Sequence, residues 1–197
     1  MSDARTVAVY AARALEYDAM AQDTITDRRA FVAALPAGDG PILDWGCGPG
    51  HDAAAFAAAG LWVEATDATP AMVDLAAKKG VTARCESFEA LPETSRMRGI
   101  WANFSLLHAE AAALPGLIAR AAFALVPGGV LHLGMKRGTG TARDDLDRRY
   151  AYVEAKDLDR ITVRAGLSRV GLRHGRGAGL SGRDDDYIIH LSRKSHD

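Results

Sequence analysis

The chain has 197 residues, of which 48% are hydrophobic and 25% are charged, and its formal net charge is −1 at pH 7. This composition predicts a single globular domain over residues 1–197. The near-zero charge argues against a nucleic-acid partner, and the lack of an apolar run of about 18 residues argues against a transmembrane helix. We therefore expect neither a nucleic-acid nor a membrane partner.

The first residues of the chain lack the apolar segment of a signal peptide, so we expect a cytoplasmic protein. Cys47 and Cys85 have no metal-ligand spacing. We therefore expect two free thiols and no metal site. The oligomeric state stays open between a monomer and a homodimer.

Residues 5–35 are predicted to form two helices, followed by a linker at residues 36–40. Asp23 or Thr24 is placed to cap the second helix. Apolar residues at intervals of three or four give the first helix one apolar stripe, which consists of Val7, Tyr10, Ala14 and Tyr17. These side chains either pack on a sheet or face a ligand.

A strand, a glycine-rich turn and a helix are predicted next. Residues 42–45 form a short apolar run with one carboxylate, Asp44, and residues 53–59 are almost all alanine up to a stop at Gly60. The turn between them contains Gly46, Gly48 and Gly50. Glycine is used where the backbone needs a positive φ or must pass close to a ligand. Such a unit presents backbone N–H groups at the carboxyl edge of a sheet.

The residues around the turn favour a ligand with cationic groups. A nicotinamide-binding fingerprint would place glycine at position 51 and an apolar residue at position 44, where the chain has His51 and Asp44. A carboxylate at position 44 would repel phosphate. A nicotinamide-dependent oxidoreductase therefore remains as a weaker alternative.

The second strand, residues 61–66, ends at Asp67, roughly 20 residues beyond Gly46, the spacing expected for an acid that accepts both ribose hydroxyl groups. A helix is predicted at residues 70–79, so Asp67 could alternatively be a helix cap. The third strand is predicted at residues 81–85.

Strands are also predicted at residues 97–103 and 130–136, and Asn103, Ser105 and His108 follow the first of these. A helix at residues 157–165, capped by Asp157, leads to a pair of strands at residues 166–172 and 186–192, joined by a loose loop rich in glycine and arginine. Alternating strands and helices predict an α/β fold. It is a Rossmann-like, doubly wound, seven-stranded and mostly parallel sheet with a C-terminal antiparallel strand pair and helices on both faces.

The order Asp-x-Gly-x-Gly-x-Gly at residues 44–50 resembles motif I of class I S-adenosylmethionine-dependent methyltransferases, and residues 67–72 match the second motif of that family. The resemblance implies S-adenosyl-L-methionine as cofactor, S-adenosyl-L-homocysteine as product, and residues 1–38 as a helical lid on a core of residues 39–197. The cofactor-binding residues that it implies are Asp44, Gly46, Cys47, Gly48, Gly50, Asp67, Ala68, Met72, Glu86, Ser87, Phe88, Asn103 and Ser105.

Within the family, Trp101-Ala102 with Ser105-Leu106-Leu107-His108 resembles a subgroup of small methyltransferases related to the tellurite-resistance type. Residues 86–92 depart from the third family motif, so the adenine is read by Glu86, by Ser87 or by a backbone carbonyl group. The sequence does not choose among these three.

The resemblance implies transfer of a methyl group to a small-molecule acceptor. His108 is the best candidate for a general base, and its alternative role is structural. The other residues expected near the acceptor are Tyr10, Tyr17, Lys136 and Tyr150. A cofactor-binding partner subunit without catalysis is the remaining alternative.

Overall fold

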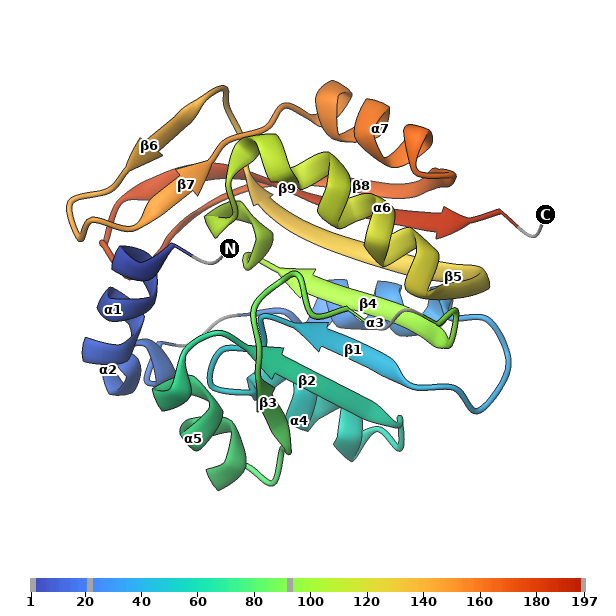
Figure 1. Cartoon of the computed structure of the whole chain (residues 1–197), viewed down its shortest axis with the longest axis horizontal. Coiled ribbons are helices and arrows are strands. Elements are labelled where there is room, and N and C mark those ends of the chain that lie inside the picture. Colours follow the sequence, from blue (N-terminus) through green and yellow to red (C-terminus); the bar gives the residue numbers. More distant parts are fainter. Residues whose placement is uncertain (1–2, 21–22, 92–93, 196–197) are drawn as a thin grey trace.

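The computed structural model describes residues 3–20, 23–91 and 94–195. Its centre is a seven-stranded sheet in the order β3-β2-β1-β4-β5-β9-β8 (Figure 1). The parallel strands are β1 (Ile42–Trp45), β2 (Val63–Asp67), β3 (Ala83–Cys85), β4 (Met97–Asn103) and β5 (Leu125–Lys136). The antiparallel pair is β8 (Leu167–Ala178) and β9 (Asp184–Lys194). This confirms the predicted sheet.

Helices cover both faces of the sheet. On one face, α6 (Leu114–Ala124) and α7 (Ala155–Arg164) bury leucine and isoleucine side chains against β4 and β5. On the other face, α3 (Ile25–Ala34) and α4 (His51–Ala58) bury Phe31 and Phe56 around Trp101. Because both faces are covered, all four residues of β1 are buried.

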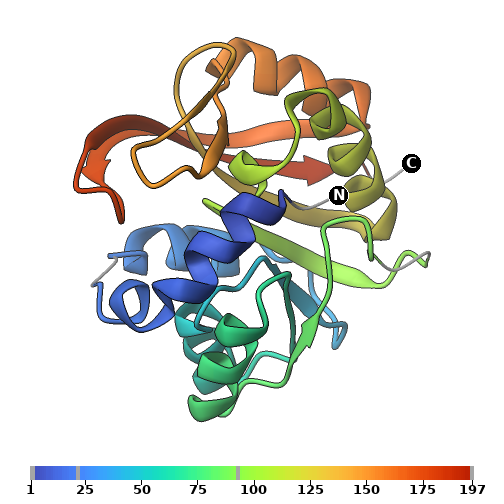
Figure 2. The ribbon, with the colours of Figure 1, turned by 60° about the vertical axis from the view of Figure 1, so that its left-hand side comes forward.

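The remaining elements lie at the edges and ends of the sheet. Helix α5 (Pro70–Lys78) packs beside α4 through Ala76. Two single-turn helices, η1 (Leu106–His108) and η2 (Ala111–Ala113), follow β4. Helices α1 (Ala4–Ala12) and α2 (Ala14–Asp18) cross the edge at which the parallel strands end (Figure 2).

Several predicted boundaries were wrong. The expected first helix is broken at Arg13, so the N-terminal segment has three helices. Helix α7 begins after Glu154, and Asp157 lies inside its first turn instead of capping it. The loop predicted after residue 172 is mostly strand, because β8 pairs with β9 as far as Ala178. Strand β5 starts at Leu125, five positions before the expected residue 130.

A small hairpin after β5 was not predicted. It consists of β6 (Thr141–Arg143) and β7 (Arg149–Ala151), which pair with each other outside the main sheet. The hairpin lies beside α1 (Figures 1 and 2). Asp3 forms an ion pair with Arg143 at 2.8 Å, and the Thr6 hydroxyl accepts a hydrogen bond from the Arg149 amide at 2.9 Å. The hairpin thus anchors the first helix over the end of the sheet.

Candidate active site

A pocket with a volume of about 450 Å³ lies where β1, β2 and β4 end. The glycine turn and the strand ends line one side, and residues of α1, α2 and α3 line the other. A volume of this size is typical of sites for small organic ligands. The place is the one at which open α/β sheets bind ligands, outside the carboxyl ends of the strands.

The glycine turn needs its glycines for two different reasons. Gly46, Gly48 and Gly50 have φ values of +80°, +53° and +82°, which side chains disfavour. A Cβ at Gly46 would also collide with the Cβ of Ser105, whose hydroxyl donates to the Trp45 carbonyl at 2.6 Å. At Gly48 the nearest atom is a Tyr17 ring carbon at 3.5 Å, so that glycine faces the pocket.

Asp44 is buried beneath the turn, and its Oδ2 atom has no hydrogen-bond partner among the described residues. The Ala53 amide donates to this carboxyl group. Burial, and then the nearby charges of Asp52 and Asp67, raise its pKa well above the usual value. A buried carboxylate oxygen without a donor destabilises an empty site and suits a ligand that brings a cationic donor.

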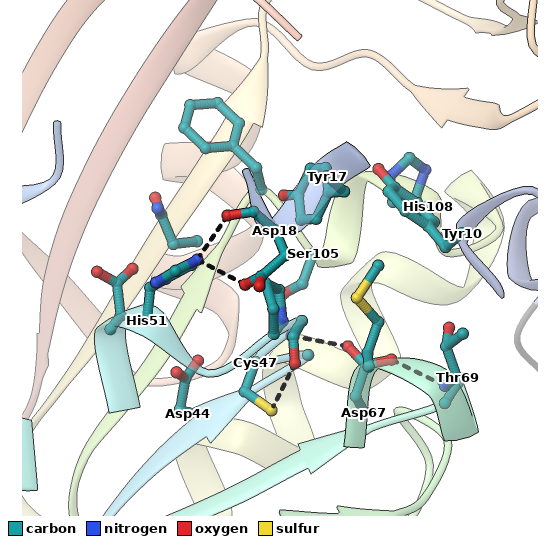
Figure 3. A pocket seen from close by; sticks show the side chains of 18 of the residues that line it. Tyr10, Tyr17, Asp18, Asp44, Cys47, His51, Asp67, Thr69, Ser105 and His108 are labelled. Atoms are coloured by element: carbon teal, nitrogen blue, oxygen red, sulfur yellow. Dashed lines mark hydrogen bonds and ion pairs between the residues drawn. The ribbon is translucent and has the colours of Figure 1, made fainter. Parts of the chain in front are cut away.

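Asp67 joins the two halves of the site. Its Oδ2 accepts the Gly48 amide at 2.9 Å, and its Oδ1 accepts the Thr69 amide at 2.8 Å (Figure 3). Burial raises its pKa, whereas these two hydrogen bonds oppose the rise. Each carboxylate oxygen has a further lone pair, so Asp67 can hold the loop after β2 and still accept hydrogen bonds from a ligand.

The segment after β3 contributes Glu86 and Phe88 to the pocket, whereas Ser87 does not line it. The Oε1 atom of Glu86 accepts from Arg84 at 3.0 Å, and its Oε2 atom is buried without a partner among the described residues. The Phe88 ring packs edge-on against Trp45, with centroids 5.7 Å apart. Of the two side chains that the sequence left open for reading adenine, only Glu86 therefore lines the pocket. Pro92, the last residue of this motif, lies outside the described residues.

Tyr10, Tyr17 and His108 line the opposite side of the pocket (Figure 3). The His108 Nδ1 atom lies 2.7 Å from the Arg149 carbonyl, which only accepts, so Nδ1 carries the proton. Nε2 then accepts from the Tyr10 hydroxyl at 2.9 Å. Burial lowers the pKa of His108 to about 3. The ring is therefore neutral near pH 7, and both of its nitrogens are hydrogen-bonded within the protein.

The other predicted residues divide between the pocket and its surroundings. Gly50 does not line the pocket, since it faces Ala76 of α5. Lys136 and Tyr150 lie behind His108, with the Lys136 ammonium 3.6 Å from the Tyr150 ring centroid and 2.5 Å from Asp185. The remaining predicted residues that line the pocket are Cys47, Ala68, Met72, Asn103 and Ser105.

One carboxylate of the pocket that the sequence did not predict is Asp52. It accepts the Thr24 hydroxyl at 2.6 Å and the Trp101 indole N–H at 2.9 Å, and Arg28 lies 3.5 Å away. Its place in the first turn of α4 was a usable signal, because carboxylates are favoured at helix N-termini. Arg28 gave no such signal, since only the packing of α3 against α4 brings it to the pocket.

Asp18, at the end of α2, contacts side chains of α4 and of the residue that follows α5. Asp18 forms an ion pair with Lys79 at 2.5 Å, and the His51 Nε2 atom lies 2.9 Å from the same carboxylate. Lys79 hydrogen-bonds to Asp18 and lowers the pKa of that carboxyl group. The predicted helical lid is thus tied to α4 and α5 as well as to the hairpin.

Residues 42–129 match the family profile described as "Methyltransferase domain". This match covers less than half of the chain. The matched residues include the glycine turn, Asp67 and His108, and therefore most of the pocket. No curated protein matches the chain significantly.

Solved structures share the fold over nearly the whole chain. The 1,6-didemethyltoxoflavin-N1-methyltransferase of Burkholderia thailandensis, solved with its substrate and S-adenosylhomocysteine, has a TM-score of 0.73 and 22% identity, covering 98% of this chain and 88% of its own. The CcbJ methyltransferase of Streptomyces caelestis has a TM-score of 0.75 and 21% identity, covering 98% and 100%. At these identities the likeness concerns the fold.

Among the described residues, no group of three or more His, Cys, Asp and Glu side chains could hold a metal ion, and Cys47 and Cys85 are free thiols. No helix in residues 3–20, 23–91 and 94–195 is long and apolar enough to span a membrane.

Proposed function

We propose that the protein binds S-adenosylmethionine in this pocket and transfers its methyl group to a small molecule. The observation that carries the proposal is the buried Oδ2 of Asp44, which has no partner among the described residues. It lies beside a glycine turn, with Asp67 at the end of the neighbouring strand. A cationic amino-acid group fits the first carboxylate and ribose hydroxyl groups fit the second. When bound, the cofactor supplies an activated methyl group on a sulfonium sulfur.

We assign different residues of the pocket to different parts of this cofactor. Asp67 accepts the ribose hydroxyl groups, and Phe88 and Met72 lie beside the adenine. Glu86 offers its Oε2 atom, which lacks a partner in the described part of the chain, to the same half of the ligand. Asp44 receives the ammonium group at the other end, and Gly48 leaves room for the chain between them.

Arg28 is the only lysine or arginine among the described residues that line the pocket, and its contact with Asp52 is loose at 3.5 Å. We assign it to the carboxylate of the cofactor. The substitution Arg28→Gln should then weaken S-adenosylmethionine binding about 10- to 100-fold, because it removes a hydrogen bond between charged groups. Calorimetry measures this.

Two controls sharpen that experiment. Arg29→Gln removes the same charge from an exposed position on α3 and should leave affinity unchanged. Methylthioadenosine, which lacks the amino-acid end, should bind the Arg28→Gln variant as well as the unaltered protein. An equal loss for both ligands would show that Arg28 acts through the fold and not through the carboxylate.

The proposed role of Asp44 makes cofactor binding depend on pH. In the empty protein its raised pKa favours the protonated carboxyl group, whereas a bound ammonium group favours the ionised form. Binding therefore releases a proton, and affinity should rise with pH, by at most about tenfold per unit. Below about pH 7 the ligand's own amino group stays charged. Calorimetry in buffers of different ionisation enthalpies would measure the number of protons released per ligand bound. The substitution Asp44→Asn should abolish this release.

The proposed function competes with two alternatives. A nicotinamide-dependent enzyme is disfavoured by the carboxylates at the turn. The second alternative is a cofactor-binding partner subunit without catalysis. Calorimetry with S-adenosylmethionine, S-adenosylhomocysteine and NAD is the deciding test. No binding of the first two to folded protein would end the methyltransferase reading.

We also propose a domain organisation, a location and an acceptor size for the protein. We place residues 1–197 in one domain with residues 1–38 as its lid, in a cytoplasmic monomer or homodimer. The pocket volume of about 450 Å³ favours a small acceptor over a polymer. The narrower likeness to the tellurite-resistance type rests on Trp101, Ser105 and His108. Trp101 and Ser105 are buried, and they donate hydrogen bonds to Asp52 and to the Trp45 carbonyl group, respectively.

A further inference from the structure

One part of the pocket lining is aromatic. We call it the acceptor wall, and it consists of Tyr10, Tyr17, Phe104 and His108. Tyr10 packs edge-on against both Tyr17 and His108, with centroids 5.2 and 5.3 Å away. Figure 3 shows Tyr10, Tyr17 and His108 across from Asp44, Cys47 and Asp67. If the cofactor lies on the turn as proposed, this wall faces the remaining space.

Phe104 adopts an unfavourable backbone conformation at its place in the acceptor wall. It is one of two described non-glycine residues with a positive φ, at +53°. That conformation costs about 1–3 kcal/mol for a bulky residue. Its amide donates to the Gly134 carbonyl at 3.1 Å, and its ring packs edge-on against Tyr187 at 5.3 Å. Both contacts fix a phenyl ring at the end of β4.

The acceptor wall offers no available base. The Tyr10 hydroxyl donates to His108 and accepts from Arg148 at 2.9 Å. The only lone pair on the His108 ring is the one taken by Tyr10, and its other nitrogen donates to the Arg149 carbonyl. A proton passing from an acceptor to His108 would have to displace these contacts and charge a buried ring.

The charges around the pocket also disfavour an anionic acceptor. Six carboxylates line it, namely Asp3, Asp18, Asp44, Asp52, Asp67 and Glu86, whereas Arg28 is the only lysine or arginine among the described lining residues. Three of these carboxylates form ion pairs with cations that do not line the pocket: Asp3 with Arg143, Asp18 with Lys79, and Glu86 with Arg84. A negatively charged acceptor would find no spare cation at the wall.

We infer that the acceptor is a small, uncharged nitrogen heterocycle, methylated on a ring nitrogen that carries a lone pair. This inference rests on the proposed function. The nitrogen lone pair forms the new N–C bond as the C–S bond of the sulfonium breaks and its electron pair stays on sulfur. The positive charge moves from sulfur to the heterocycle, and no proton is released. Aromatic rings and surrounding carboxylates both stabilise such a cation.

The first experiment measures binding to protein saturated with S-adenosylhomocysteine. Calorimetry would compare three bicyclic probes of similar shape: quinoline, 1-naphthol and 1-naphthoate, together with one-ring and purine-type heterocycles. We expect at least one heterocycle to bind, and 1-naphthoate to bind at least 100-fold more weakly. A panel in which no heterocycle binds, or in which the carboxylate binds best, would overturn the inference.

The second experiment follows methyl transfer by mass spectrometry. The binding heterocycle should gain one methyl group as a fixed cation, in single turnovers whose rate shows no solvent deuterium isotope effect. Preferential methylation of the naphthol, or a large isotope effect, would show that a proton is removed and would contradict the inference.

Two variants test the wall itself. Phe104→Leu and Tyr17→Leu should weaken binding of the N-methylated cation about two- to thirtyfold, the range of cation–π contacts, and affect naphthalene less. An equal loss for both ligands would reduce the wall to apolar packing and overturn its role. Failure of S-adenosylmethionine to bind the unaltered protein would instead reject the proposed function, so the two failures are distinguishable.

Discussion

Replacing Asp67 by alanine is expected to weaken binding of S-adenosylmethionine by about 2–4 kcal/mol, because two charge-assisted hydrogen bonds to the ribose are lost in a buried site. The same change removes the acceptor of the Gly48 and Thr69 amides. Part of the loss therefore comes from a glycine turn that is no longer held in place. Calorimetry with the purified variant measures the total.

Comparison of ligands separates these effects. Methylthioadenosine retains the ribose, so Asp67→Ala should weaken it as much as S-adenosylmethionine, unlike Arg28→Gln. Asp74→Ala, which removes an exposed carboxylate from α5, is the matched control and should change neither affinity. If Asp67→Ala binds as tightly as the unaltered protein, Asp67 serves only to order the loop.

The substitution Asp144→Ala should lower the free energy of unfolding by about 3–5 kcal/mol, the usual cost of leaving one member of a buried ion pair unpaired. The side chains of Arg148 and Asp144 are 2% and 5% exposed. Two nitrogens of Arg148 donate to Asp144 Oδ2, at 3.0 and 2.6 Å, and the Arg148 and Leu146 amides donate to Oδ1. Urea unfolding measures the loss.

Matched variants make that result specific. Asp145→Ala, at the exposed neighbouring position, should change stability by less than about 0.5 kcal/mol. The double variant Asp144→Leu with Arg148→Met should recover much of the stability, because it removes both charges. A small effect of Asp144→Ala alone would mean that water reaches Arg148 when the carboxylate is missing.

The sequence by itself determined the organisation of the sheet and the half of the pocket built on the turn. Those features depend on residues close together in the chain: a buried apolar run, glycines where φ is positive, and an acid at the end of the next strand. Local backbone preference and the alternation of strands and helices are sufficient for such a prediction. Asp44, Gly48 and Asp67 were found in this way.

The opposite half of the pocket was decided by tertiary structure. Tyr10 and Arg148 are 138 residues apart in the chain, yet they share a hydrogen bond, and His108 joins them through the Tyr10 hydroxyl. Arg28 and Asp52 meet only because α3 packs against α4. No local pattern encodes such pairs, since each side chain alone is compatible with solvent. Their burial, and with it the neutral state of His108, follows only from how the lid and the hairpin pack over the strand ends.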